Sequence, residues 1–210
     1  MHIQPFCFNP IQVNSYLLWD DDLNALIIDP GCYSNREKNT LQEFIQNNKL
    51  ILRAILNTHL HFDHILGNAF VENTYAVGSQ AHKDDLFLLN QLPLHAQLFG
   101  VTAREICRQP VALLEDGDLV HCGNFTLKAI HSPGHSPGSL VFYCEKEKCL
   151  FSGDVLFRES IGRSDLQGGN SNTLFSSLQR LMELPHDTVV YPGHGPQTTI
   201  EYERLHNPFL

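Results

Sequence analysis

The sequence has no hydrophobic run approaching the ~20 residues that a membrane-spanning helix requires. Its N-terminus, MHIQPF, also lacks the basic segment followed by an apolar segment that marks a secretory signal. These absences argue against an integral membrane protein and against an exported one. We therefore expect a cytoplasmic protein that has no membrane partner.

Basic residues are scarce as well. Lys and Arg number 14 against 23 Asp and Glu, which gives a formal net charge of -9. Proteins that bind nucleic acids need a basic surface, so this balance excludes a general nucleic-acid binder. The six cysteines form no C-x-x-C pair, and a chain of 210 residues does not need disulfide staples. We expect free thiols in a reducing compartment.

What is present is a globular composition, with 42 % hydrophobic and 18 % charged residues. Two short apolar segments, residues 14–19 and 24–29, flank three aspartates and predict a β-hairpin. Further strands are expected over residues 51–56, 125–130, 139–144, 149–152 and 188–191. Strand-rich and helical segments alternate twice, in two similar halves of about a hundred residues. This order predicts two sheets covered by helices, in one αββα-type domain over residues 1–210.

Helices are expected between these strands. Two helix starts have the spacing of a capping box, Ser34 with Glu37 and Thr198 with Glu201. Other helices are expected over residues 79–90 and 173–184. Residues 92–109 fit either a lid over a site or an ordinary loop and helix packed on the sheet.

Twelve histidines almost equal the lysines and arginines combined, which directs attention to metal ligands. Residues 58–64, with the sequence THLHFDH, directly follow a predicted buried strand. Within them His59, His61, Asp63 and His64 are all metal-competent, a density that chance placement does not explain. In a short loop the first two can point toward one ion while the last two turn toward a neighbouring one. Imidazole and carboxylate are ligands that zinc favours.

Three further turns each hold one metal-competent side chain beside a predicted strand. They place His135 in SPGHSPG, Asp154 in FSGD and His194 in YPGHGP. Each turn alone is a weak signal, because Gly/Pro turns are common. Loops gather at one edge of a sheet, so the repetition predicts one shared site.

The order H-x-H-x-D-H, then separate His, Asp and His, resembles the metallo-β-lactamase-fold hydrolases over essentially the whole chain. Residues 153–157 (GDVLF), 161–165 (IGRSD), 192–196 (PGHGP) and 207–210 (NPFL) are similar to the short glyoxalase II-like branch. That branch resembles hydroxyacylglutathione hydrolase without its C-terminal helical domain, and we expect the same of a chain that stops at Leu210. The resemblance implies an α+β class and a four-layer αββα fold, with two mixed sheets between helices.

The resemblance also implies sites for two divalent metal ions, zinc first, with iron or manganese as alternatives. One ion would be held by His59, His61 and His135, the second by Asp63, His64 and His194, and Asp154 would bridge them. The family pattern makes Asp63 a candidate catalytic proton acceptor too, a role that the sequence does not separate from metal binding.

A metal-dependent hydrolase of small-molecule thioesters such as S-lactoylglutathione is the function that this resemblance implies. Two cations about 3.5–4 Å apart would generate a hydroxide that attacks the acyl carbon, and they would stabilise the oxyanion. A thiolate leaves readily, so no strong general acid is required. Arg163 matches a basic residue that contacts the glycine carboxylate of glutathione in the longer enzymes, which makes it a candidate substrate-binding residue. A solvated ion pair near Asp165 is the alternative.

Other functions share parts of this pattern. Persulfide dioxygenases have the same fold and a similar Gly-Arg-x-Asp stretch but use one iron, and the PGHGP form favours the hydrolase. A lactonase or a phosphodiesterase would use the same metal chemistry. A true β-lactamase fits less well because such enzymes are exported, and a nuclease of this fold usually has a basic surface. A non-catalytic metal-binding module fits least, because all seven ligand positions are filled.

Overall fold

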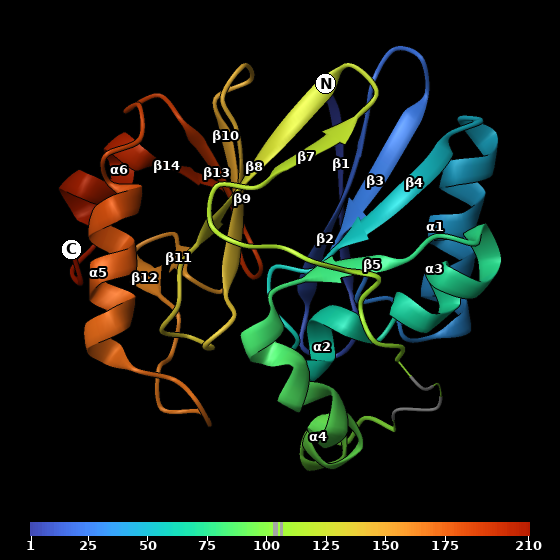
Figure 1. Cartoon of the computed structure of the whole chain (residues 1–210), viewed down its shortest axis with the longest axis horizontal. Helices are drawn as coiled ribbons and strands as arrows, with labels where there is room; N and C mark the ends of the chain where they lie inside the picture. Colours follow the sequence, from blue (N-terminus) through green and yellow to red (C-terminus); the bar gives the residue numbers. More distant parts are fainter. Residues whose placement is uncertain (103–104, 106) are drawn as a thin grey trace.

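Strands from two parts of the chain form two six-stranded sheets that face each other in the computed structural model, which describes residues 1–102, 105 and 107–210 (Figure 1). The first sheet has the order β1 (His2–Phe8), β2 (Val13–Trp19), β3 (Asn24–Ile28), β4 (Ile51–Leu56), β5 (Ser79–Ala81) and β6 (Ala112–Leu113). The second has the order β14 (Thr198–Thr199), β13 (Val189–Pro192), β10 (Cys149–Gly153), β9 (Leu140–Cys144), β8 (Phe125–His131) and β7 (Leu119–Cys122). A separate ribbon pairs β11 (Leu156–Phe157) with β12 (Ser160–Ile161).

Both large sheets are mixed. In the first, β1, β2 and β3 are antiparallel, whereas β3, β4, β5 and β6 pair in parallel. In the second, β10 and β13 are parallel and the remaining pairs are antiparallel. The predicted α+β class with two mixed sheets is therefore confirmed.

The alternation of side chains along the strands builds three apolar layers. Along β2, Leu18 packs between the sheets with Phe142 of the second sheet, while its neighbour Leu17 packs on the outer side against Leu41. Outside the second sheet, Leu150 packs against Leu178. Successive strand residues point to opposite faces, so strands buried on both faces read as continuous apolar runs.

Helices cover the two outer faces. Figure 1 shows α1 (Asn35–Asn47) and α3 (Asn68–Tyr75) beside the first sheet, and α5 (Ser171–Leu181) and α6 (Ile200–His206) beside the second. The short α2 (Phe62–Ile65), the 3₁₀ turn η1 (Lys83–Asp85) and α4 (Leu86–Leu98) lie at one end of the sheets. No helix in the described ranges is long and apolar enough to span a membrane.

The predicted capping box of α1 is confirmed, because Ser34 and Glu37 make both of its hydrogen bonds. The predicted start of α6 is wrong by one residue. Thr199 caps that helix, while the Thr198 hydroxyl donates to Glu203 at 2.5 Å. Helix α5 begins after Asn170, slightly earlier than predicted.

The prediction of a helix over residues 79–90 is wrong in its first half. Residues 79–81 form β5, which adds a parallel edge to β4, and the helix begins only at Leu86. Strand pairing with a distant segment overrides local helix propensity here. Of residues 92–109, the first seven continue α4, whereas residues 103, 104 and 106 lie outside the described residues, and the lid stays a prediction.

All six cysteines are free thiols, as predicted. Cys144 and Cys149 lie directly opposite each other on β9 and β10, and both are buried. This register places them at the base of the turn formed by residues 145–148.

Candidate metal centre

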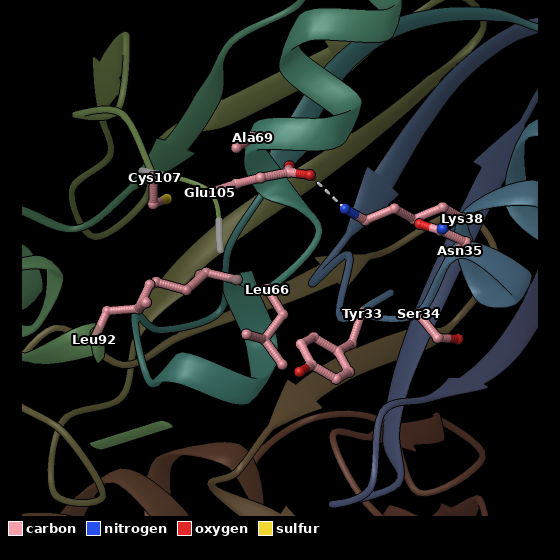
Figure 2. Close-up of a pocket in the computed structure, with 10 residues that line it drawn as sticks. Tyr33, Ser34, Asn35, Lys38, Leu66, Ala69, Leu92, Glu105 and Cys107 are labelled. Carbon is pink, nitrogen blue, oxygen red and sulfur yellow. Dashed lines mark hydrogen bonds and ion pairs between the residues drawn. The ribbon is translucent and has the colours of Figure 1, made fainter. Parts of the chain in front are cut away.

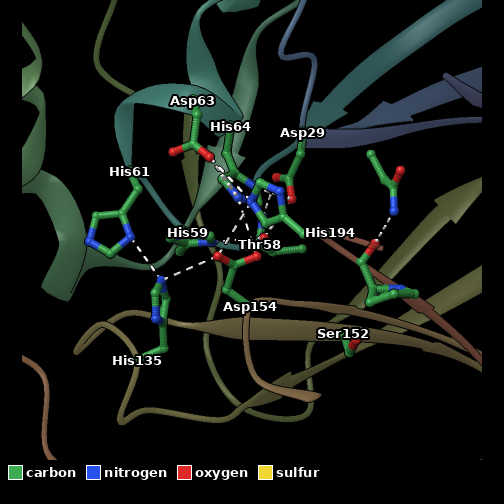
Figure 3. Close-up of polar contacts among 12 residues, drawn as sticks. Asp29, Thr58, His59, His61, Asp63, His64, His135, Ser152, Asp154 and His194 are labelled. Atoms are coloured by element: carbon green, nitrogen blue, oxygen red, sulfur yellow. Dashed lines mark hydrogen bonds and ion pairs between the residues drawn. The ribbon is translucent and has the colours of Figure 1, made fainter. Parts of the chain in front are cut away.

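The seven predicted ligands lie together at one edge of the two sheets, although they come from five segments (Figure 3). Residues 57–61 follow β4, Asp63 and His64 belong to the first turn of α2, and His135 lies in the turn between β8 and β9. Asp154 follows β10, and His194 follows β13. A hydrogen bond from the Leu140 amide to the Thr58 carbonyl, 2.7 Å long, joins the two sheets at this edge.

The first group of ligands consists of His59, His61 and His135. Each ring offers one nitrogen, and these three nitrogens lie within 4.8 Å of one another. Their three rings are nearly perpendicular in every pair, with interplanar angles of 87–89°. His61 Nδ1 and His135 Nε2 are 2.9 Å apart. An imidazole lone pair lies in the plane of its ring, so this arrangement lets the three lone pairs converge on one point.

The second group consists of Asp63, His64 and His194, which also meet within 4.8 Å. Asp63 Oδ2 lies 3.6 Å from His64 Nε2 and 3.3 Å from His194 Nε2. Asp154 stands between the groups, with one oxygen 3.4 Å from His64 Nε2 and the other 3.6 Å from both His135 Nε2 and His194 Nε2. This is the position expected of the predicted bridge.

The outer ring nitrogens of four histidines are already engaged. His135 Nδ1 donates to the Arg163 carbonyl at 2.8 Å, and His194 Nδ1 donates to the Gln12 carbonyl at 3.2 Å. His64 Nδ1 donates to Asp29 at 2.9 Å. Because a carbonyl or a carboxylate only accepts, each of these rings carries a proton on Nδ1 and turns Nε2 toward the centre.

The same logic fixes His59 through a longer chain. The Thr58 hydroxyl donates to the Asp29 carboxylate, so its oxygen accepts from His59 Nδ1 at 3.0 Å. Outer partners of this kind orient metal ligands and set their tautomer. Asp29 therefore supports two of the predicted ligands, one directly and one through Thr58.

Buried polar atoms at the centre test whether a metal fits. His59 Nε2, His64 Nε2 and Asp154 Oδ1 are buried, and none of them has a hydrogen-bond partner among the described residues. A buried polar atom without a partner is costly, and cations bound at the two groups would satisfy all three. The donor set of imidazoles and carboxylates fits a divalent metal ion.

Burial and neighbouring rings keep His59 and His61 of the first group neutral. Burial, followed by the His135 ring, lowers the pKa of His61 to about 3, and burial lowers the pKa of His59 well below its usual value. The second group behaves differently. Burial alone would lower the pKa of His64, but the Asp154 and Asp63 carboxylates outweigh it and raise that pKa well above its usual value.

Two glycines allow the backbone to approach the ligands closely. A Cβ at Gly193 would overlap Asp154 Oδ1 and crowd the His64 ring. Gly153 has φ +49° and lies against Thr58. Both positions therefore require glycine, because a larger residue would displace a ligand or its partner.

A cavity of about 280 Å³ opens onto both ligand groups. Its walls are mainly apolar and consist of Ile11, Phe62, Leu88, Leu98, Phe99 and Leu166, with His95, Arg163 and Gln167 as polar additions. Leu98 and Phe99 are 73 % and 54 % exposed, so a bound molecule could cover apolar surface that now faces solvent.

Arg163, the predicted substrate-binding residue, lines this cavity. Its guanidinium makes two 2.7 Å hydrogen bonds to Asp165, and both side chains are more than half exposed. Its backbone carbonyl is the acceptor that orients His135. The structure thus gives this residue a positioning contact that the sequence did not reveal.

Sequence reasoning missed several residues around the site. The apolar walls from α4 carry no motif, and Asp29 was only the last residue of the predicted strand over residues 24–29. Asp85, a buried carboxylate that contacts the ligand loops, gave no signal at all. An acidic residue at the end of a predicted strand could have directed attention to Asp29.

Two other features lie outside this centre. A cavity of about 260 Å³ beside α2 has the Lys38–Glu105 ion pair, 2.6 Å long, in its wall (Figure 2). A third set of metal-competent side chains, His82, Asp84 and His131, also comes together. However, its two rings stack 4.0 Å apart at 12°, so their lone pairs run nearly parallel and do not converge.

Two sheets between helices, with clustered His and Asp side chains at one edge, define a metal-dependent hydrolase of the αββα type. The model of the metallo-beta-lactamase superfamily matches residues 8–194, and the chain belongs to this family.

Relatives of known name or structure cover nearly the whole chain. Hydroxyacylglutathione hydrolase GloC of Haemophilus influenzae is 36 % identical over 100 % of this chain and 98 % of its own. The crystal structure of TTHA1623 in a di-iron-bound form has a TM-score of 0.89 at 40 % identity and covers 99 % of this chain and 100 % of its own. That of the BLEG-1 B3 metallo-beta-lactamase has a TM-score of 0.89 at 39 % identity, with 100 % and 99 % covered.

Proposed function

We propose that this protein hydrolyses thioesters such as S-lactoylglutathione at a centre of two divalent metal ions. One ion would be held by His59, His61 and His135, the other by Asp63, His64 and His194, with Asp154 shared. The observation that carries the proposal is the convergence of ring nitrogens and carboxylate oxygens on one centre, where the outer nitrogens of His64, His135 and His194 are already fixed.

The proposed reaction needs bound cations and a proton acceptor from the chain. Bound there, divalent cations would supply an activated water molecule and polarise the substrate carbonyl. Asp63 is buried, but His64 and His194 offset the effect of burial, so its pKa lies below the usual value and the carboxylate stays anionic. It is the candidate proton acceptor as well as a ligand.

The apolar cavity walls and the ionisable side chains beside the site favour a thioester. Among the described lining residues, His95 and Arg163 are the ionisable groups outside the ligand set. An amide would require a strong acid to protonate its leaving nitrogen, whereas a thiolate leaves without one. The relative named hydroxyacylglutathione hydrolase supports the same choice.

Zinc is the metal that we propose, because it accepts this ligand set and needs no redox chemistry. Iron and manganese accept the set too, and the di-iron-bound neighbour makes iron a direct alternative. Metal analysis of the purified protein decides between them.

The test combines metal content with a substrate panel. Protein loaded separately with zinc, iron or manganese is assayed on S-lactoylglutathione, a lactone, a phosphodiester, a β-lactam and glutathione persulfide with oxygen uptake. We expect two ions per chain and faster turnover of the thioester than of any other substrate in the panel. His59→Ala should lose metal and activity together, whereas the exposed His121→Ala should keep both.

Two results would contradict the proposal in different ways. Hydrolysis of the thioester by metal-free protein would reject the metal centre. Full metal loading with turnover of another member of the panel, and none of any thioester, would reject the substrate and leave the metal centre standing.

A further inference from the structure

Asp85 is a fully buried carboxylate that lies outside the ligand set, at the end of η1. It accepts hydrogen bonds from the Leu60 amide at 3.1 Å, the Ser136 hydroxyl at 2.8 Å and the Gly138 amide at 2.6 Å. Leu60 stands between His59 and His61 in the chain. One side chain therefore joins the loop of two predicted ligands to the loop of the third.

The loop of His135 lies so close to Asp85 that only glycine fits at position 138. A Cβ at Gly138 would overlap the Asp85 carboxylate and its backbone amide. The glycine allows the short 2.6 Å bond, which is the tightest of the three. A hydrogen bond of this kind to a charged acceptor is about twice as strong as one between neutral groups.

The same corner of the chain contacts this loop a second time. The His82 ring stacks on the His131 ring 4.0 Å away, and His131 Nε2 donates to the Pro137 carbonyl at 2.8 Å. Residues 82–85 thus contact both the start and the end of the turn that carries His135. Residues 82–85 follow β5 of the first sheet, whereas His135 follows β8 of the second.

A different carboxylate, Asp29, directly supports the second ligand group and reaches His59 of the first group only through Thr58. Asp29 accepts from the Thr58 amide at 2.7 Å and from His64 Nδ1 at 2.9 Å, so it touches a ligand directly. Asp85 accepts from backbone and hydroxyl groups beside ligands. An effect of Asp85 on the geometry of the first group therefore acts through the separation of the two loops.

We infer that Asp85 is a positioning residue that sets the separation of the His59–His61 loop from the His135 loop, and so controls the affinity of the first ligand group alone. This inference rests on the metal centre proposed above. Shifts of well under 1 Å are enough to matter, because metal geometry tolerates little displacement.

The experiment measures cobalt binding separately at each group. Metal-free protein is titrated with Co²⁺ and followed by its visible absorption, in two backgrounds. His194→Ala leaves the first group intact, and His61→Ala leaves the second. Asp85→Ala, Asp85→Asn and the matched control Asp84→Asn, a half-exposed neighbour, are introduced into each.

In the His194→Ala background, we expect Asp85→Ala to weaken Co²⁺ binding by about 10–100-fold and to alter the absorption spectrum. Asp85→Asn keeps one acceptor oxygen, so its loss should be intermediate. In the His61→Ala background neither change should alter the affinity, and Asp84→Asn should be silent in both. Thermal unfolding of the metal-free variants reports whether they fold, and Ser136→Ala replaces Asp85→Ala if that variant does not.

Equal losses in both backgrounds would show a general structural role and overturn the inference. Unchanged affinity and spectrum in the His194→Ala background would overturn it too. Absence of Co²⁺ binding by the unsubstituted protein would instead reject the proposed metal centre itself.

Discussion

The two ligand groups stand side by side but are built differently. In the first, burial keeps the His59 and His61 imidazoles neutral, and the two loops that carry the group meet at Asp85. The second mixes a carboxylate with two imidazoles whose pKa values are raised by Asp63 and Asp154 despite burial, and it is supported by Asp29. One half of the centre therefore holds two neutral rings, whereas the other pairs histidines of raised pKa with carboxylates.

Removing the shared carboxylate should have the largest effect, because it belongs to both halves. Asp154→Ala takes away the group that lies within 3.6 Å of His64, His135 and His194. We expect loss of both metal ions and a fall in kcat of roughly 10³-fold or more. Metal analysis and thioester assays measure it, with the exposed Asp187→Ala as the control. Retention of one tightly bound ion would show that the halves are independent.

Removing Asp29 should weaken the second half more than the first. Asp29→Ala leaves the buried Thr58 amide without its acceptor and frees the His64 ring to rotate. We expect a 10–100-fold loss of affinity at the second group, roughly the cost of losing an outer partner. Cobalt titration in the His61→Ala background measures it. Asp29→Asn should cause an intermediate loss of affinity. An equal loss in the His194→Ala background would contradict the stronger role of Asp29 in the second group.

The pH dependence of metal binding should differ between the halves. In the metal-free protein the raised pKa of His64 means that it holds a proton near neutral pH, which a cation has to displace. Affinity at the second group should therefore rise with pH, by about tenfold per unit for each proton released. His61, with its pKa lowered to about 3, carries no second ring proton for a cation to displace. The metal affinity of the first group should therefore change little with pH. Titrations at several pH values in the two single-group backgrounds measure both slopes, and equal slopes would refute the contrast.

The smallest effect is expected at the cavity wall, which both halves share. Phe99→Ala removes a half-exposed ring whose centroid lies 5.2 Å from the centroid of the Phe62 ring. We expect KM to rise by about 3–10-fold with little change in kcat, because apolar contact with the substrate is lost but the ligands stay in place. Leu94→Ala, an exposed residue of α4 outside the cavity lining, is the matched control. A fall in kcat with unchanged KM would place Phe99 in the chemical step.

Local patterns predicted much of the fold. Strand β4 was predicted with its observed limits, and the capping box of α1 was predicted because Ser34 and Glu37 lie within one turn. The failures involve distant partners. Residues 79–81 became a strand by pairing with β4, and Thr198 bonds to Glu203 instead of capping its own helix.

The sequence by itself determined the chemistry of the centre, because its ligands occur in short motifs whose order and residue types are visible along the chain. His59, His61, Asp63 and His64 are near one another before folding begins. Only the tertiary structure decided how His135, Asp154 and His194 meet them, which nitrogen each ring offers, and that Asp29 and Asp85 hold the loops. Those contacts join segments up to 182 residues apart, and a side chain's partner at such a separation is fixed by the packing of the two sheets, not by its neighbours in sequence.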